Sequence, residues 1–292
     1  MKRLKSLLTA LMLLLCTMDA GAHNFEVGGI YYNLLSGGNV EVTFRGRSSE
    51  EFENEYTGVI TIPETVEYYG ITYNVISVGN SAFENCYGLK GVVIPNSVTG
   101  IGEYAFSSCY HLTEVAIGSN VASIGEYAFA NCSDLTGIEL PSNLSTIEYN
   151  AFDGCKSITS IVIPKSVTKI FGVYGVLGGC ENLASITVDP ENTYYDSRQN
   201  CNAIIETATN TLIAGCMNSV IPNSVTSIEY GAFEGCVGLT SITIPNSVTR
   251  IGVSAFSGCS GLISIILPDG ISHIDAYMLM GCSSLTNIEI PN

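Results

Sequence analysis

The sequence carries little charge, and very little of that charge is positive. Only 13% of its 292 residues are Asp, Glu, Lys or Arg, and 11 basic residues against 27 acidic ones give a formal net charge of −16. A protein that binds nucleic acid needs a basic patch or stripe, so the sequence predicts no nucleic-acid partner. Tryptophan is absent, whereas hydrophobic residues make up 46% of the chain. This composition excludes a disordered polyampholyte and predicts a sizeable core.

Long hydrophobic runs are also missing, and the one apolar segment near the start is too short to cross a bilayer comfortably. It runs from Leu7 to Leu15, follows three basic residues and precedes the triplet Ala20-Gly21-Ala22. This order is typical of a secretory signal peptide over residues 1–22, with the mature chain beginning at His23. A lipoprotein signal with Cys16 as the lipidated residue is the alternative, although Leu15 stands where that signal has a small residue. The mature chain is predicted to have no integral membrane segment and a net charge of −18, since three basic residues and one acidic residue leave with the signal.

Glycine and cysteine are abundant, and the cysteines reveal an internal repeat. Seven of the 11 cysteines fall into two series with a spacing of 23 residues: Cys86, Cys109, Cys132 and Cys155, then Cys236, Cys259 and Cys282. Cys180 departs from this spacing by two residues. An Ala-Phe pair precedes six of these eight cysteines, and an aliphatic residue follows each of them three positions later. Alternating aliphatic residues and usually a proline come next, as in Val92-Val93-Ile94-Pro95.

Each part of the repeat has a structural role. The aliphatic alternation predicts a short, half-buried strand, and the Pro-Asn-Ser step that often follows ends the strand. The Ala-Phe-x-x-Cys string predicts a single turn whose Ala, Phe and Cys point inward. A unit of 23 residues cannot bury a hydrophobic face alone, so the repeats are expected to stack into a solenoid. About ten strand positions are expected, ending near Ile62, Ile94, Ile117, Leu140, Ile163, Val188, Ile221, Ile244, Leu267 and Ile290.

The pattern L-x-x-I-x-I-P-x-x-V-x-x-I-x-x-x-A-F-x-x-C resembles the BspA-type leucine-rich repeat. Eight near-copies cover most of residues 76–292. The resemblance implies a leucine-rich-repeat solenoid with short parallel strands and short helical turns. It also implies an exported or surface protein of bacteria, because members of this family are typically used for adhesion and protein binding.

Three parts of the chain depart from the repeat. Residues 23–75 predict a β-rich N-terminal cap with strands at 27–32, 40–44 and 59–62, a hairpin turn at Gly37-Gly38 and an insertion after Pro63. Residues 76–292 predict the solenoid, interrupted by an insertion at about 189–220. The chain ends in the middle of a repeat, so either the sequence is a fragment or a short gene product, or a partner covers the last strand.

The insertion predicts a β-hairpin, because two apolar runs flank the turn at 207–210. Pairing across that turn places Cys201 opposite Cys216, and a disulfide is a possible outcome in an exported protein. The repeat cysteines are expected to be small buried hydrophobes instead. One thiol per coil cannot build a tetrahedral zinc site, so no metal or cofactor is predicted.

No catalytic constellation is evident. The histidines, His23, His111 and His273, are far apart in the repeat order, and no G-x-S-x-G or H-E-x-x-H motif occurs. The segment 189–192 lacks EF-hand spacing and predicts a loop. A recurring carboxylate predicts a solvated stripe, formed by Glu103, Glu126, Glu148 and Glu229. The chain is therefore expected not to be an enzyme, with a glycan-acting enzyme as an alternative.

The outward side of the strands predicts a flat surface without a deep pocket, which suits extended protein contacts. Tyrosine pairs outside the regular coils either pack the irregular segments or contact a partner. The expected contact surface comprises Tyr194, Tyr195, Thr187 and Thr243. The expected function is an exported, non-enzymatic protein-binding or adhesion module of the bacterial cell surface, with a host matrix protein or a bacterial surface component as partner. A structural envelope or spacer protein without a specific ligand is the alternative.

Overall fold

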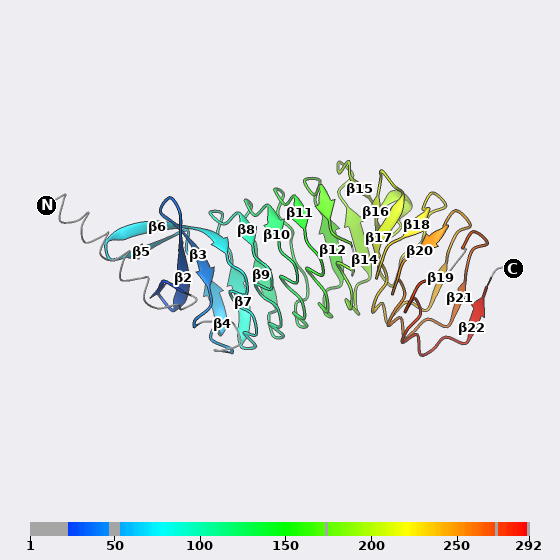
Figure 1. Ribbon diagram of the computed structural model, residues 1–292, viewed down its shortest axis with the longest axis horizontal. Helices are drawn as coiled ribbons and strands as arrows, with labels where there is room; N and C mark the ends of the chain where they lie inside the picture. The colour runs from blue at the N-terminus through cyan, green and yellow to red at the C-terminus, as the bar shows by residue number, and fades with distance from the viewer. Residues whose placement is uncertain (1–22, 47–52, 173–174, 272–273, 291–292) are drawn as a thin grey trace.

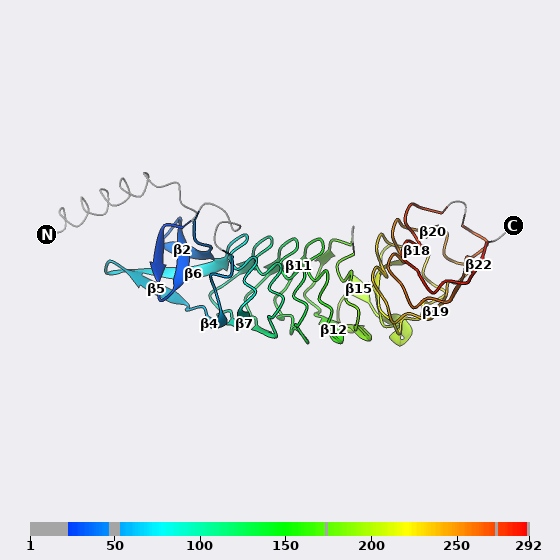
Figure 2. The same cartoon turned by 90° about the horizontal axis from the view of Figure 1, so that it is seen from below.

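The computed structural model describes residues 23–46, 53–172, 175–271 and 274–290. The predicted signal peptide with Cys16 lies outside these residues, as does His273. Figure 1 shows an elongated molecule in which the N-terminal strands lie at one end and the coils follow one another along the long axis. The view turned by 90° shows the same order, with β2, β5 and β6 at one end and β22 at the other (Figure 2). The leucine-rich-repeat solenoid expected from the sequence is the observed fold.

The N-terminal end consists of a small β-structure joined to the first coils. An antiparallel meander is followed by a parallel strand that carries an antiparallel hairpin partner. In chain order these strands are β1 (Phe25–Val27), β2 (Ile30–Leu35), β3 (Asn39–Thr43), β5 (Thr65–Tyr68) and β6 (Ile71–Val78). Because β6 also pairs with the first short strand of the solenoid, the sheet continues from this end into the stack.

One detail of this end differs from the expectation, and another is confirmed. The single strand expected at 27–32 is split, because Gly28 and Gly29 adopt φ values of +62° and +80° and turn the chain between β1 and β2. The strand expected at 59–62 exists as β4 (Gly58–Thr61) and pairs with the first long strand of the solenoid. It is therefore the first strand of the stack, as the expected strand position ending near Ile62 predicts.

Each coil of the solenoid has three sides. The long-strand side carries β4 and then β7 (Leu89–Val93), β9 (Glu114–Ala116), β12 (Ser160–Ile163), β14 (Ser185–Val188), β19 (Ser241–Thr243), β21 (Ser264–Ile266) and β22 (Asn287–Glu289). The short-strand side carries β8 (Gly100–Ile101), β10 (Ser123–Ile124), β11 (Thr146–Ile147), β13 (Lys169–Ile170), β18 (Ser227–Ile228) and β20 (Arg250–Ile251). The turn side carries the Ala-Phe-x-x-Cys segments. Pairing between successive coils is parallel on both strand-bearing sides.

The two strand-bearing sides differ in continuity. On the short-strand side, one sheet runs without a break from β6 to β13. The long-strand side is divided into three sheets, β4-β7-β9, β12-β14 and β19-β21-β22. The strands expected to end at Leu140 and Ile221 are not formed, and these two segments lie where one sheet stops and the next begins.

In its described residues, the turn side forms single turns but no helical turns, contrary to the expectation of short helical turns. Within residues 23–46, 53–172, 175–271 and 274–290, the one helix is the 3-10 turn η1 (Arg198–Asn200). The Ala-Phe-x-x-Cys segments are hydrogen-bonded turns in which the residue before Ala and the residue before Cys have positive φ, for example Tyr127 at +52° and Asn131 at +60°. A right-handed helix cannot pass through such residues.

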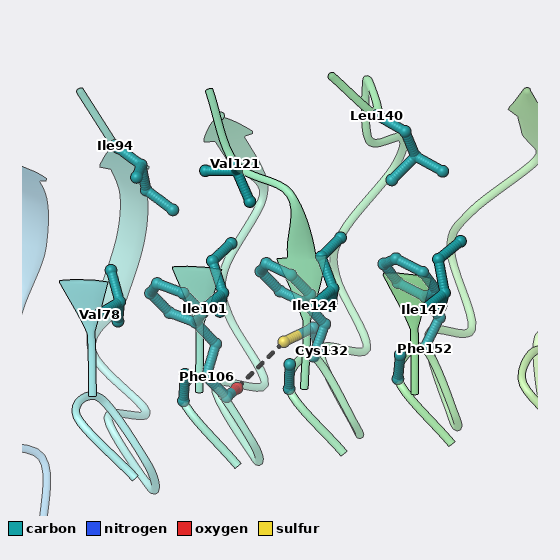
Figure 3. Close-up of a cluster of buried hydrophobic side chains, with 14 of the residues drawn as sticks. Val78, Ile94, Ile101, Phe106, Val121, Ile124, Cys132, Leu140, Ile147 and Phe152 are labelled. Carbon is teal, nitrogen blue, oxygen red and sulfur yellow. Dashed lines mark hydrogen bonds between the residues drawn. The ribbon is translucent and has the colours of Figure 1, made fainter. Parts of the chain in front are cut away.

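Aromatic rings and thiols form the interior of these turns. Phe83, Phe106, Phe129 and Phe152 are fully buried, and neighbouring ring centroids are 4.9, 5.0 and 5.7 Å apart. Cys132 lies below this column, and its thiol donates a hydrogen bond to the carbonyl oxygen of Phe106 in the preceding coil, at 3.2 Å (Figure 3). Cys109, Cys155 and Cys259 make the same contact to the Phe one coil earlier. The repeat cysteine is thus a buried hydrophobe that also supplies a weak donor.

The insertion forms an antiparallel hairpin within the stack. Its strands are β16 (Ala203–Glu206) and β17 (Thr211–Gly215), with β15 (Tyr195–Asp196) beside β16. β17 runs parallel to β18, so the hairpin is the rung that connects to the last coils. Its two faces serve two cores, because Ile204 and Ile213 pack with the preceding coils whereas Ile205 and Leu212 pack with the following ones.

Of the two outcomes left open for Cys201 and Cys216, a disulfide or two free thiols, the structure has the free thiols. A bulge between Ile204 and Ile205 shifts the register, so that Ala203 lies opposite Gly215. Cys201 and Cys216 are both free and buried. Cys201 belongs to the core of the last coils and Cys216 to the core of the first coils, so the bulge places the two thiols on different faces.

Candidate binding surface

The two threonines of the expected contact surface point outward from the long-strand side, but they lie in different sheets. Thr187 is exposed on β14, and Thr243 is exposed on β19. Thr187 lines a groove of about 530 Å³ together with Asp189 and Arg198, whereas Thr243 does not line it. Of the pair, only Thr187 lies beside the insertion in a concave surface.

The two tyrosines of the insertion have different environments. The side chain of Tyr194 is 51% exposed, whereas that of Tyr195 is 4% exposed. The hydroxyl oxygen of Tyr195 accepts a hydrogen bond from the backbone N–H of Ile170 at 2.8 Å, and burial raises the pKa of this phenol. Tyr195 therefore fastens the insertion to β13, and Tyr194 alone is available to a partner.

A buried asparagine holds this loop in place. Asn192 is 7% exposed, and its side-chain oxygen accepts hydrogen bonds from the backbone N–H groups of Tyr194 and Tyr195 at 2.8 and 2.9 Å. Its side-chain nitrogen donates to the carbonyl oxygens of Pro164 and Val167, both at 2.9 Å. Sequence reasoning assigned Asn192 to a polar loop, but its four contacts make it the support on which Tyr194 is presented.

The positive charge in the groove is already neutralised. Arg198 forms an ion pair with Asp196 at 2.6 Å and donates a further hydrogen bond to Asn210 at 2.8 Å. The guanidinium group thereby ties η1 to the hairpin turn. Asp189 accepts a hydrogen bond from the N–H of Glu191 at 2.8 Å, and its carboxylate leaves the groove with acidic character.

The thiols and histidines that the structure describes lie in separate environments. Burial raises the pKa of Cys86 to about 12 and raises the pKa of the other repeat cysteines as well, so these thiols stay protonated. His111 contacts Asp134 at 2.8 Å on an exposed surface, and His23 packs against Tyr31 at the N-terminal end. In the part of the chain that the structure describes, no group of three or more His, Cys, Asp or Glu side chains could hold a metal ion.

The recurring glutamates follow one edge of the coils, beside a row of tyrosines that sequence reasoning did not single out. Tyr104 and Tyr127 stack with ring centroids 5.0 Å apart and nearly parallel planes. Burial raises the pKa of Glu148, which is half-buried in this row. The repeated Glu-Tyr-Ala-Phe string was the available signal. Because the stacked rings cover one another's faces, the row contributes to packing between coils more than to an open binding platform.

Comparison with known proteins agrees with this geometry. The BspA type leucine rich repeat region matches in 6 copies, over residues 48–183, 111–211 and 213–292. The chain belongs to the BspA-type leucine-rich repeat family. No curated protein matches the sequence. In the described residues of this BspA-type chain, no helix is both long and apolar enough to span a membrane.

Solved structures of bacterial repeat proteins resemble the BspA-type chain. A leucine rich repeat protein of T. pallidum is 24% identical, with a TM-score of 0.52, and the match covers 82% of this chain and 90% of that one. The pneumococcal vaccine antigen PcpA is 18% identical, with a TM-score of 0.51 and coverage of 90% and 86%. A leucine rich cell surface protein of Faecalibacterium prausnitzii is 26% identical, with a TM-score of 0.47 and coverage of 91% and 94%. The first two likenesses establish the shared fold.

The residues that the BspA-type repeats share are core residues. The Ala, Phe and Cys of the turns are nearly all buried, and so are the inward aliphatic residues of the strands. The outward positions of the long strands differ from coil to coil, running Val93, Ala116, Glu139, Val162, Thr187, Thr243, Ile266 and Glu289. The repeat therefore specifies the scaffold, and any selective contact must come from these varying positions and from the insertion.

Proposed function

We propose that the chain is an exported, non-enzymatic protein-binding module that acts in adhesion at the bacterial cell surface. One observation carries the proposal: a rigid stack of near-identical coils presents an outward surface whose residues vary from coil to coil. Extended surfaces of this kind are how repeat proteins engage other proteins. The partner is a host matrix protein or a bacterial surface component.

The sequence before His23 supports export. A basic start, a short apolar segment and Ala-Gly-Ala at 20–22 form the order of a secretory signal. Buried free thiols are compatible with both oxidising and reducing compartments. The proposal of export therefore rests on residues 1–22.

The preferred contact lies around the insertion. Tyr194 combines a large exposed ring with a polar tip and stands on a loop that Asn192 holds rigidly, which limits the entropy lost on binding. Thr187 lies in the groove beside it. Tyr195 is buried and Thr243 lies on another sheet, so neither belongs to the proposed contact.

The test is a capture experiment with the chain beginning at His23, using purified matrix proteins and bacterial surface fractions as ligands. Tyr194→Ala should weaken binding without lowering the melting temperature. Tyr69→Ala is the matched control, because Tyr69 is an exposed tyrosine at the N-terminal end, 71% exposed. Equal binding by the two variants would remove Tyr194 from the contact, and capture of no ligand would favour the spacer protein.

A further inference from the structure

The long-strand side opens at one coil. Residues 136–140 form no strand, and no backbone hydrogen bond joins this segment to residues 113–117 before it or to residues 159–163 after it, all of which the structure describes. The neighbouring coils are paired normally: Val92 lies opposite Val115, and the N–H of Ile94 donates to the carbonyl oxygen of Ala116 at 2.8 Å. The other two sides of the same coil are continuous, since β10 pairs with β11 and the N–H of Phe129 bonds to Ala151. We call residues 136–140 the open rung.

The open rung exposes part of the core. Val115, Ile117 and Ile138 are only half-buried, whereas their counterparts in the paired coils, Val92, Ile94 and Ile161, are each 2% exposed. A groove of about 960 Å³ lies here, lined by these half-buried residues together with other residues from both sides of the break. Unpaired backbone groups beside an apolar floor are the features to which an extended peptide can add as a strand.

Gly137 keeps the groove open. A Cβ atom at this position would meet nothing within 4 Å, and its φ is not in the left-handed region. Gly91 holds the equivalent position two coils earlier. A Cβ there would lie 3.3 Å from the side chain of Glu114 in the adjacent strand. The space beside Gly137 is therefore empty. The backbone conformation at this position does not require glycine.

The charges around the groove are acidic. Its lining includes Glu139 and Asp189 and contains no Lys or Arg. Lys165 follows the lining residue Pro164, but its ammonium group is paired with Glu191 at 2.6 Å. A cationic occupant is therefore favoured, and a second copy of this chain is not, because two molecules with a formal net charge of −16 repel each other.

We propose that the open rung binds an extended peptide segment of the partner by strand addition, and that this segment alternates apolar and basic residues. Apolar side chains would face Val115, Ile117 and Ile138, and the basic side chains of the opposite face would lie near Glu139 and Asp189. Backbone hydrogen bonds to the open rung would supply affinity, and the alternating contacts would supply selectivity. This inference rests on the proposed function, since it names the class of partner that such a binding module takes.

Three synthetic peptides of about eight residues test the chemistry, a length that spans a typical strand. The first alternates Lys with Val, the second alternates Glu with Val, and the third is the Lys-Val peptide with alternate backbone nitrogens methylated. Calorimetric titration of the chain beginning at His23 should detect the first peptide, with binding that weakens as salt is added. The Glu-Val and methylated peptides should each bind at least about tenfold more weakly, because they lack the charge match or the backbone donors.

Three variants locate the site. Gly137→Tyr should fill the groove and weaken the Lys-Val peptide at least about tenfold, and Glu139→Gln should weaken it several-fold at low salt only. Thr243→Tyr is the matched control, since it adds the same ring to an exposed position of the same side in another sheet. Melting curves establish whether each variant is folded. If Gly137→Tyr does not fold, Glu139→Gln alone decides the test.

Hydrogen exchange gives an independent readout. Amides of residues 137–139 should exchange faster than those of 160–163 in the free protein and become protected with the Lys-Val peptide. Absence of binding by the Lys-Val peptide, or equal binding to Gly137→Tyr and the unaltered chain, overturns the inference. Either result leaves the proposed function standing if the captured partner still binds the chain. If no partner is captured but the Lys-Val peptide still binds, the proposed function is overturned and this inference is not.

Discussion

Replacement of Phe129 by alanine is expected to lower the free energy of unfolding by about 3–5 kcal/mol. The side chain is fully buried and lies between two parallel rings, with centroids 5.0 Å from Phe106 and 5.7 Å from Phe152. Loss of two stacked contacts, worth about 0.5–1.5 kcal/mol each, favours the upper part of that range. The cavity cannot close easily, because the spacing between coils is fixed by backbone hydrogen bonds. The N–H of Phe129 donates to the carbonyl oxygen of Ala151, and the N–H of Phe106 donates to that of Ala128.

Urea unfolding followed by circular dichroism measures this effect. Phe129→Leu should lose only about 1–2 kcal/mol, since most of the volume is retained. Thr243→Ala, at an exposed strand position, should change stability by less than about 0.5 kcal/mol. The free energies are compared between variants whose unfolding free energy falls with urea concentration at the same slope.

The two cores give the experiment a second outcome. Phe129 belongs to the core of the first coils, and the last coils have their own core beyond the hairpin. If unfolding occurs in two steps, only the step that belongs to the first coils should shift. Equal and small losses for Phe129→Ala and Thr243→Ala would refute the reasoning, because the ring column would then contribute no more than an exposed position.

Three further effects are expected. Ellman's reagent should modify half-buried Cys282 first in the native protein and leave the fully buried repeat thiols unreacted. Gly215→Ala should lose more than about 2 kcal/mol in urea unfolding, since the new Cβ would lie 2.1 Å from the ring of Phe233, whereas Gly137→Ala, which meets nothing, should be nearly neutral. Burial raises the pKa of Asp153 from 3.8 to about 6, so the native state holds the proton more tightly and stability should fall as pH rises from 4 to 6, by at most about 3 kcal/mol. Asp153→Asn should flatten that fall, and an unchanged pH profile would contradict the assignment.

The scaffold was predictable because its physical cause is local and repeated. A fixed period of 23 residues forces equivalent side chains into equivalent places, so the inward Phe, Cys and aliphatic columns follow from the spacing alone. The turns were harder: residues such as Tyr127 and Asn131 take positive φ, and nothing in the string Ala-Phe-x-x-Cys distinguishes such a turn from a short helix. The thiol hydrogen bond to the preceding Phe carbonyl was equally hidden, since it joins residues 26 positions apart.

The departures from regularity depend on contacts between coils. Residues 137–140 have the same alternation as the paired strands, so the sequence predicts a strand that the structure lacks. Whether a ladder closes depends on how successive coils tilt against each other, which no single repeat encodes. The bulge between Ile204 and Ile205 is another such feature, because the hairpin must fill two cores at once, and its register follows the packing on both faces.

These departures meet in one region of the surface. The groove at the open rung and the groove beside β14 have Val162 and Asp189 in common, so the half-exposed core near Ile138 continues toward the loop that carries Tyr194. Sequence reasoning could single out this loop, because an irregular polar segment with a tyrosine pair is a departure that can be read locally, and its role as a contact stays a prediction. It could not find the open rung, where the departure is a missing set of hydrogen bonds. A stack of identical coils offers no preferred position to a partner, so under the proposed function selectivity would come from such exceptions. A rigid aromatic loop and an unpaired strand edge border the same acidic surface and are the two that we propose.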